Sequence, residues 1–407
     1  MTKLGADSEN TRQARLGSTS RRTFLKATAG AANGTTAPAP FEKAQSGKTL
    51  RFLNNETWAS SQAALRAACS EYESKFGVKV VIDSTPISGA YAKTMAAINS
   101  GQPYDLATQG FIAHILQYAI GGHLHPLTDL VSKYSWGQMG AWKYQGENWF
   151  YPYDYNLVTV FYRKDLYAER GLKVPETWAQ FAENCRALTV SQGGNIERGG
   201  CVLPIASDSA TNWASFGNLF AEGGTIYDQN WNVALDQGDI GDKTRRFLDL
   251  YDELYKTMPP GMNTVSYAEL MSLFVTGKVA HTVYSGRVVE ALEARNPELA
   301  DKYGVFASPD STGKQKALSY AFDGFIVFKT KQSEEAVKFL KWFIKDETQK
   351  RWAELGGYTC NKAVLESEAF QNATPYNKAF YDTMFKVKDF WAVPEYAELL
   401  TQLNQRV

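Results

Sequence analysis

One segment near the start of the folded chain limits the possible folds more than any other. Thr49 to Asn54 (TLRFLN) has the composition of a strand, and Val78 to Asp83 (VKVVID) reads as a second strand. Between them the spacing predicts a helix over residues 61–76, ended by Gly77, with an apolar face formed by Leu65, Cys69, Tyr72 and Phe76. A strand, a helix and a strand in this order predict two parallel strands joined by a right-handed crossover.

The rest of the chain continues this alternation of strands and helices. Two capping boxes, Thr177 with Gln180 and Ser266 with Glu269, predict helix starts. Further strands are predicted at Leu157 to Arg163, Val279 to Ser285 and Phe325 to Lys329. The chain has 407 residues, which is too long for one ordinary core and favours two lobes. The predicted fold class is therefore α/β.

Composition and charge narrow the kind of partner. The chain is 44% hydrophobic and 21% charged, as in soluble globular proteins, and its formal net charge of zero makes a nucleic acid a poor candidate partner. No stretch is long and apolar enough to span a bilayer. Cys69, Cys185, Cys201 and Cys360 form no CxxC pair, which argues against zinc or thioredoxin-like sites. Whether Cys185 and Cys201 form a disulfide stays open.

The N-terminus has the pattern of an export signal. Ser20 to Lys26 (SRRTFLK) resembles the twin-arginine motif, an uncharged stretch follows it, and Ala37-Pro38-Ala39 offers a small-x-small cleavage site. No lipobox cysteine lies near that site. We therefore expect residues 1–47 to be a signal peptide and flexible start, and the mature protein to diffuse freely in the periplasm.

Seven short segments occur in the order and spacing of one family. They are Gly121 to Leu127, Trp149 to Tyr153, Phe161 to Tyr167, Gly171 to Trp178, Gly223-Gly224, Phe274 to Ala280 and Ala336 to Phe343. Over residues 48–407 the chain resembles the extracellular solute-binding proteins of ABC importers, which include maltose-binding and glycerol-3-phosphate-binding proteins. Because that family usually continues beyond the last helix here, we expect Val407 to be a truncated end.

The resemblance implies two α/β lobes joined by crossing segments, with the ligand in a cleft between them and closure about a hinge. It assigns residues 48–153 and 308–325 to an N-terminal lobe, and residues 154–307 and 326–407 to a C-terminal lobe. The protein would be a monomer that captures a sugar or polyol and delivers it to permease subunits. It would not be an enzyme and would need no cofactor or metal.

The resemblance also marks candidate ligand contacts, because sugar sites combine hydroxyl-binding polar groups with aromatic platforms. Each candidate has an alternative role in packing, at a helix terminus, in the hinge, in the core or in a turn. The candidates are Glu56, Trp58, Asp154, Tyr155, Asn156, Trp213, Asp323, Gly324 and Tyr358. Gly324 is expected in a loop whose small residues let the backbone approach the ligand.

Two positions depart from the family pattern. Arg287 follows Tyr284-Ser285-Gly286, where the family often has an aromatic residue; it could grip a carboxylate or phosphate, or equally form a surface ion pair. Asp389 stands where the glycerol-3-phosphate branch has an arginine, and an acid there would repel phosphate. We therefore expect a neutral sugar or polyol, with Asp389 and Trp391 as further candidate contacts.

Other function classes remain open at this stage. An acidic or phosphorylated solute, such as glycerol 3-phosphate or a sugar acid, is the first alternative ligand. Carboxylates and aromatics in a cleft also describe a glycoside hydrolase, and a sensory or adhesion module could use the same fold. No GxSxG, HExxH or Walker A motif is present. His123 and His125 lie beside Gly and Pro in a predicted loop, which favours a structural role over a metal site.

Overall fold

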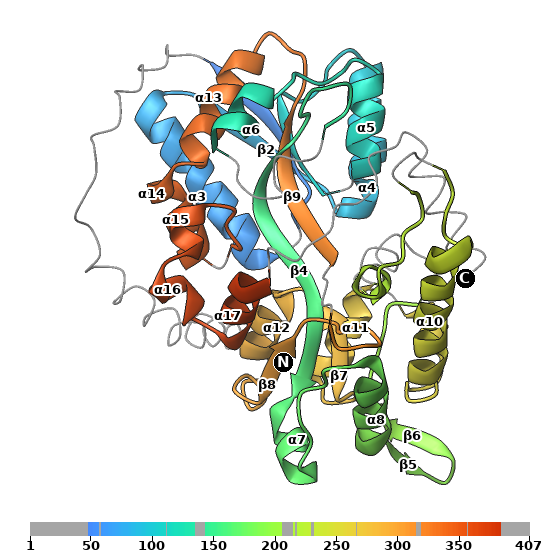
Figure 1. Cartoon of the computed structure of the whole chain (residues 1–407). Coiled ribbons are helices and arrows are strands. Elements are labelled where there is room, and N and C mark those ends of the chain that lie inside the picture. Colours follow the sequence, from blue (N-terminus) through green and yellow to red (C-terminus); the bar gives the residue numbers. More distant parts are fainter. Residues whose placement is uncertain are drawn as a thin grey trace, which may run out of the picture.

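The computed structural model of the chain has two lobes connected by two long strands (Figure 1). It describes residues 48–56, 58–110, 112–134, 143–205, 215, 218–228, 232–265, 267–314, 319–355 and 357–383. The predicted signal peptide at residues 1–47 and the last residues, 384–407, lie outside the described part of the chain.

The first lobe contains the predicted strand–helix–strand unit. β1 (Thr49–Asn54) and β2 (Lys79–Ser84) are parallel and are joined by α3 (Ala59–Phe76), which ends at Gly77 in the left-handed conformation. β1 is also parallel to β3 (Leu106–Gln109), so the carboxyl ends of both strands meet at one sheet edge. The other helices here are α4 (Ile87–Asn99), α5 (Ile112–Ile120) and α6 (Thr128–Tyr134).

Strands β4 (Tyr151–Arg163) and β9 (Ser319–Val327) connect the lobes (Figure 1). The first half of β4 pairs with β9, and its second half pairs with β7 (His281–Tyr284) and β8 (Tyr303–Phe306) in the second lobe. The end of β9 is antiparallel to β3 in the first lobe. One sheet path, β2-β1-β3-β9-β4-β7, therefore runs through both lobes.

The second lobe packs helices around β7, β8 and the end of β4. The capping box predicted at Thr177 and Gln180 is present at the start of α8, whereas Ser266 of the second predicted box lies outside the described residues. The elements are α7 (Lys164–Arg170), α8 (Trp178–Leu188), β5 (Val190–Gln192), β6 (Asn195–Arg198), α10 (Gly238–Tyr255), η3 (Met262–Thr264), α11 (Tyr267–Val275) and α12 (Arg287–Arg295).

The packing differs from the predicted lobe boundaries at two places. α13 (Ser333–Phe343) and α14 (Asp346–Glu354) belong to the same apolar core as β1 and α3, because β9 returns the chain to the first lobe. Asp310, which the sequence placed in the first lobe, instead contacts the second, where the Trp178 N–H donates to the Asp310 carbonyl at 3.2 Å. The contacts of α13, α14 and Asp310 differ from the predicted boundaries, and the rest of the predicted division stays a prediction.

The last described helices lead from the first lobe to the second. α15 (Lys362–Leu365) lies against α14, and after α16 (Glu368–Gln371) the last of them, α17 (Pro375–Thr383), lies against β8. None of the helices in the described ranges is long and apolar enough to cross a membrane.

All four cysteines are buried free thiols, so the Cys185–Cys201 disulfide is not formed here. Cys185 Sγ lies 3.6 Å from His281 Nδ1, and Cys201 Sγ lies 3.3 Å from Thr257 Oγ1. Burial raises the pKa of the Cys185 thiol well above its usual value, with a further contribution from the Cys201 side chain.

The loop with His123 and His125 extends the sheet. The Lys329 N–H donates to the His123 carbonyl and the His125 N–H donates to the Val327 carbonyl, both at 2.8 Å. This placement supports the structural role. Within the described ranges no cluster of three or more His, Cys, Asp or Glu could hold a metal ion.

Candidate functional site

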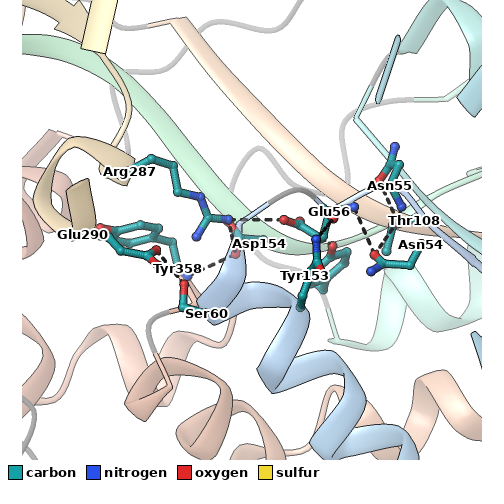
Figure 2. Close-up of polar contacts among 11 residues, drawn as sticks. Asn54, Asn55, Glu56, Ser60, Thr108, Tyr153, Asp154, Arg287, Glu290 and Tyr358 are labelled. Atoms are coloured by element: carbon teal, nitrogen blue, oxygen red, sulfur yellow. Dashed lines mark hydrogen bonds and ion pairs between the residues drawn. The ribbon is translucent and has the colours of Figure 1, made fainter. Parts of the chain in front are cut away.

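The loop after β1 supplies the first wall of the candidate site. Thr108 at the end of β3 fixes this loop, because its hydroxyl accepts from the Asn55 N–H at 2.8 Å and donates to Asn55 Oδ1 at 2.6 Å. The Glu56 N–H in turn donates to Asn54 Oδ1 at 3.0 Å. The adjacent ends of two parallel strands thus hold the Glu56 carboxylate at the edge of the first lobe, as Figure 2 shows.

β4 supplies the second wall where it leaves the first lobe. Its register against β9 shifts between Pro152 and Asp154, an irregularity of the kind that re-aims side chains beside functional sites. The Tyr153 hydroxyl donates to Glu56 Oε1 at 2.8 Å, and the Tyr358 N–H donates to Asp154 Oδ2 at 3.2 Å. Both carboxylates are therefore held by hydrogen bonds, and both side chains are buried.

Arg287, the first residue of α12, enters this site from the second lobe (Figure 2). Its Nη2 lies 3.5 Å from Asp154 Oδ2 and 3.7 Å from Glu56 Oε2. The guanidinium also lies 5.8 Å from the Trp58 ring centre and 5.6 Å from that of Tyr358, within cation–π range. Only 3% of the Arg287 side chain is exposed, so the surface ion pair considered from sequence is wrong: the ion pair is buried.

The charges of the site favour a cation inside it. Burial alone would lower the pKa of Arg287, but the nearby carboxylates of Asp154 and Glu56 outweigh burial and raise it well above its ordinary value. Asp323, opposite Asp154 in β9, raises that pKa further. One guanidinium thus faces two contacting carboxylates with a third nearby, and the group as a whole is negative.

Two donors of the site stay unpaired. Among the described residues, Arg287 Nη1 and Asn55 Nδ2 are buried and have no hydrogen-bond partner. Leaving such a donor unpaired costs about 1–3 kcal/mol. Arg287 Nη1 belongs to the guanidinium that lies beside two carboxylates and two rings, so a hydroxyl placed there could accept its hydrogen bond.

Comparison with known proteins identifies the family. The family model for bacterial extracellular solute-binding proteins matches residues 56–350. The chain belongs to this family. It is 25% identical over 356 residues to the mannitol-binding protein of Pseudomonas aeruginosa, covering 83% of this chain and 79% of that protein.

Solved structures of other solute-binding proteins share the fold. One is an ABC transporter solute-binding protein from Agrobacterium radiobacter K84 in complex with ribitol, with a TM-score of 0.73, 20% identity and coverage of 89% of this chain and 93% of that one. Another, from Agrobacterium vitis S4 with bound D-mannitol, has a TM-score of 0.69, 22% identity and coverage of 88% and 92%. The two-lobed α/β architecture predicted from sequence is thereby confirmed, and these relatives are binding proteins.

Five of the contacts predicted for this solute-binding protein come together. Glu56 and Trp58 come from the loop after β1, Asp154 from β4, Arg287 from α12 and Tyr358 from the segment after α14. Tyr358 also donates its hydroxyl to the Gly286 carbonyl at 2.8 Å, which ties that segment to the start of α12. Their convergence agrees with the predicted site, while contact with a ligand stays a prediction for each.

The remaining predicted positions have other outcomes. Residues 155 and 156 lie in β4 opposite Phe322 and Ala321, and Asp323 is partly exposed in β9. Gly324 lies within β9 and not in a loop; a Cβ there would overlap the Phe150 ring, so packing of Phe150 explains the glycine. The side chains of Tyr155 and Asn156, and the whole of Trp213, Asp389 and Trp391, lie outside the described part.

Sequence reasoning missed the groups that position this site. Tyr153, at the end of a segment that the family pattern had marked, holds Glu56, and Asn55, next to Glu56, carries an unpaired donor. Ser60 and Glu290 were not considered, yet their side chains are hydrogen-bonded at 2.6 Å. The one sequence signal concerns Glu290, which stands three residues after Arg287 and therefore on the same side of a helix.

Proposed function

We propose that this chain is the substrate-binding component of an ABC importer and that it captures a neutral polyol or small sugar. Membership of the solute-binding family and the resemblance to a mannitol-binding protein support this class of function. Ribitol- and D-mannitol-bound proteins of the same fold point to a polyol among the possible ligands.

The observation that carries the choice of ligand is the buried ion-pair group of Arg287. The Arg287 guanidinium is already paired with the carboxylates of Asp154 and Glu56. These two carboxylates would repel an anionic ligand, and no uncompensated positive charge of Arg287 would attract it. A neutral ligand avoids that repulsion, and its hydroxyls can accept from Arg287 Nη1 and donate to carboxylate oxygens. This reasoning favours a neutral ligand over an acidic or phosphorylated one.

Family membership supports capture over hydrolysis, because the matched family and the solved structures of the same fold are binding proteins. Because β4 and β9 are the long strands shared by the lobes, a ligand that contacts both sides stabilises a closed arrangement by its differential affinity for it.

We further propose the cellular setting. The Arg21-Arg22 motif supports export through the twin-arginine route, and the family supports a periplasmic location. In that compartment a monomer would present its ligand-bound form to the permease subunits of an importer. These finer assignments rest on the sequence motif and on family membership.

A binding screen tests the proposal. The purified protein would be titrated calorimetrically with D-mannitol, ribitol, D-tagatose and maltose, and with gluconate and glycerol 3-phosphate as anionic counterparts. Saturable binding of a neutral compound, with the ligand recovered unchanged by chromatography, is the expected result. Binding of only the anions would overturn the charge argument, and a consumed ligand would overturn the non-enzymatic assignment.

A further inference from the structure

A second contact joins the lobes beside the Arg287 ion pairs. Ser60, at the start of α3 in the first lobe, donates its hydroxyl to Glu290 Oε2 at 2.6 Å, and Glu290 lies on α12 in the second lobe (Figure 2). Arg287 and Glu290 are three residues apart on α12 and therefore lie on one side of that helix. Glu56, in the loop before α3, contacts Arg287, and Ser60, at the start of α3, contacts Glu290, so two contacts join this part of the first lobe to α12.

The surroundings of Ser60 favour a carboxylate from the other lobe. α3 has no acidic residue in its first turn and no side-chain cap, so its N-terminal end lacks a negative partner of its own. Ser60 is buried, whereas Glu290 is partly exposed. Glu290 therefore brings a negative charge to the N-terminal turn of α3 while one side of it stays accessible to water.

We propose that Ser60 and Glu290 are positioning residues for ligand binding, whose hydrogen bond fastens the second lobe to the first beside the ligand site. This inference rests on the proposed function, because it gives the contact a purpose in solute capture. Neither residue is assigned a contact with the ligand. Their effect is on the arrangement of Glu56 and Arg287, which lie on opposite sides of the same boundary.

The affinity for the ligand then depends on the Ser60–Glu290 hydrogen bond, which does not itself contact the ligand. If opening separates α3 from α12, the hydrogen bond forms only in the closed arrangement and increases the fraction of molecules that can bind tightly. Removing a charge-assisted hydrogen bond that is partly exposed should then weaken binding by about 3- to 20-fold. The loss should appear mainly as faster dissociation.

The experiment uses the full chain with Ser60→Ala, Glu290→Gln and the double substitution. D-mannitol affinity is measured by calorimetry, dissociation by stopped flow, and the radius of gyration without ligand by small-angle X-ray scattering. We expect each single variant to bind D-mannitol more weakly and to be larger than the wild type without ligand. The double variant should be no weaker than the weaker single variant, because both changes remove one contact.

Matched controls carry the same chemical changes elsewhere. Ser132→Ala removes a hydroxyl that donates to a backbone carbonyl in α6, and Glu253→Gln removes an exposed carboxylate of α10. Both should bind D-mannitol as the wild type does. Unchanged affinity and unchanged size in both single variants, or additive losses in the double variant, would overturn the proposal.

The two proposals fail in different ways. If the wild type does not bind D-mannitol or the other neutral compounds, the proposed ligand class fails, and the radius of gyration without ligand still decides whether Ser60 and Glu290 hold the lobes together. If the wild type binds but the variants do so equally well, with no change in size, only the positioning role fails.

Discussion

Replacing Arg287 with methionine tests the buried charge group directly. The substitution keeps a long side chain between Trp58 and Tyr358 but leaves Glu56 and Asp154 buried without their cation. At separations of 3.5 and 3.7 Å, each attraction is worth about 4.5 kcal/mol at an effective dielectric constant of about 20. Desolvation of the three groups offsets much of that sum.

The expected net effect follows from what the substitution leaves behind. Removing one partner of a buried ion pair costs about 3–5 kcal/mol, against total stabilities of about 5–15 kcal/mol for natural proteins. We therefore expect Arg287→Met to lower the free energy of unfolding by about 3–5 kcal/mol at pH 7.5. Arg287→Lys keeps the charge and should lose distinctly less, although it loses the planar fork.

The pH dependence of this variant separates charge from packing. Without the guanidinium, two neighbouring buried carboxylates disfavour ionisation, so their pKa values in the folded variant should rise above those in the unfolded chain. The folded variant then binds more protons than the unfolded one, and its stability should increase as the pH falls from 7.5 to 5.

Urea denaturation followed by circular dichroism, at both pH values, measures these differences. An Arg287→Met variant within about 1 kcal/mol of the wild type, or one whose deficit is larger at pH 5, would refute the charge argument. A deficit of equal size at both pH values would point to lost packing around Trp58 and Tyr358 instead.

Three further substitutions, and one matched control, test other parts of the structure. Burial lowers the pKa of His281 to about 4 in the folded protein, below its value in the unfolded chain. The free energy of unfolding should therefore fall as the pH drops from about 6.5 towards 4. Urea denaturation of His281→Asn over the same pH range should show a smaller fall. Gly324→Ala should lower the unfolding free energy by about 1–3 kcal/mol, because the new methyl group meets Phe150. A matched substitution, Gly193→Ala, has open space but a positive φ, so it should reveal backbone strain alone. Tyr358→Phe removes the hydroxyl that donates to Gly286 and should weaken ligand binding measured by calorimetry while keeping the ring beside Arg287.

Local signals in the sequence predicted the parts of the fold that depend on nearby residues. The β1–α3–β2 unit has its apolar face and its terminating Gly77 within one continuous segment, and the Thr177 capping box is complete within four residues. The path of the chain after β9 could not be read in this way. It depends on β9 pairing with β3 across a long separation in sequence, and that pairing carries α13 into the first lobe.

The candidate site shows the same division between local and distant information. The family resemblance marked Glu56, Asp154 and Tyr358, and the structure brings them together. For Arg287 the sequence left an anion grip and a surface ion pair equally open, because burial is set by residues from both lobes. The Ser60–Glu290 contact joins residues 230 positions apart, and no local pattern links the two to each other.

The position of Arg287 links ligand choice to lobe closure. A cation on α12 that pairs with Glu56 of the first lobe and Asp154 of β4 contacts the two sides and the strand between them. A ligand that accepts a hydrogen bond from Arg287 Nη1 would therefore bind beside the ion pairs that Arg287 forms with Glu56 and Asp154. An anion would compete with Glu56 and Asp154 for the guanidinium and weaken the contact that holds the lobes together, whereas a neutral hydroxylated molecule would add to it. Under the proposed function, selection against charge and stabilisation of the closed arrangement would therefore have one physical cause.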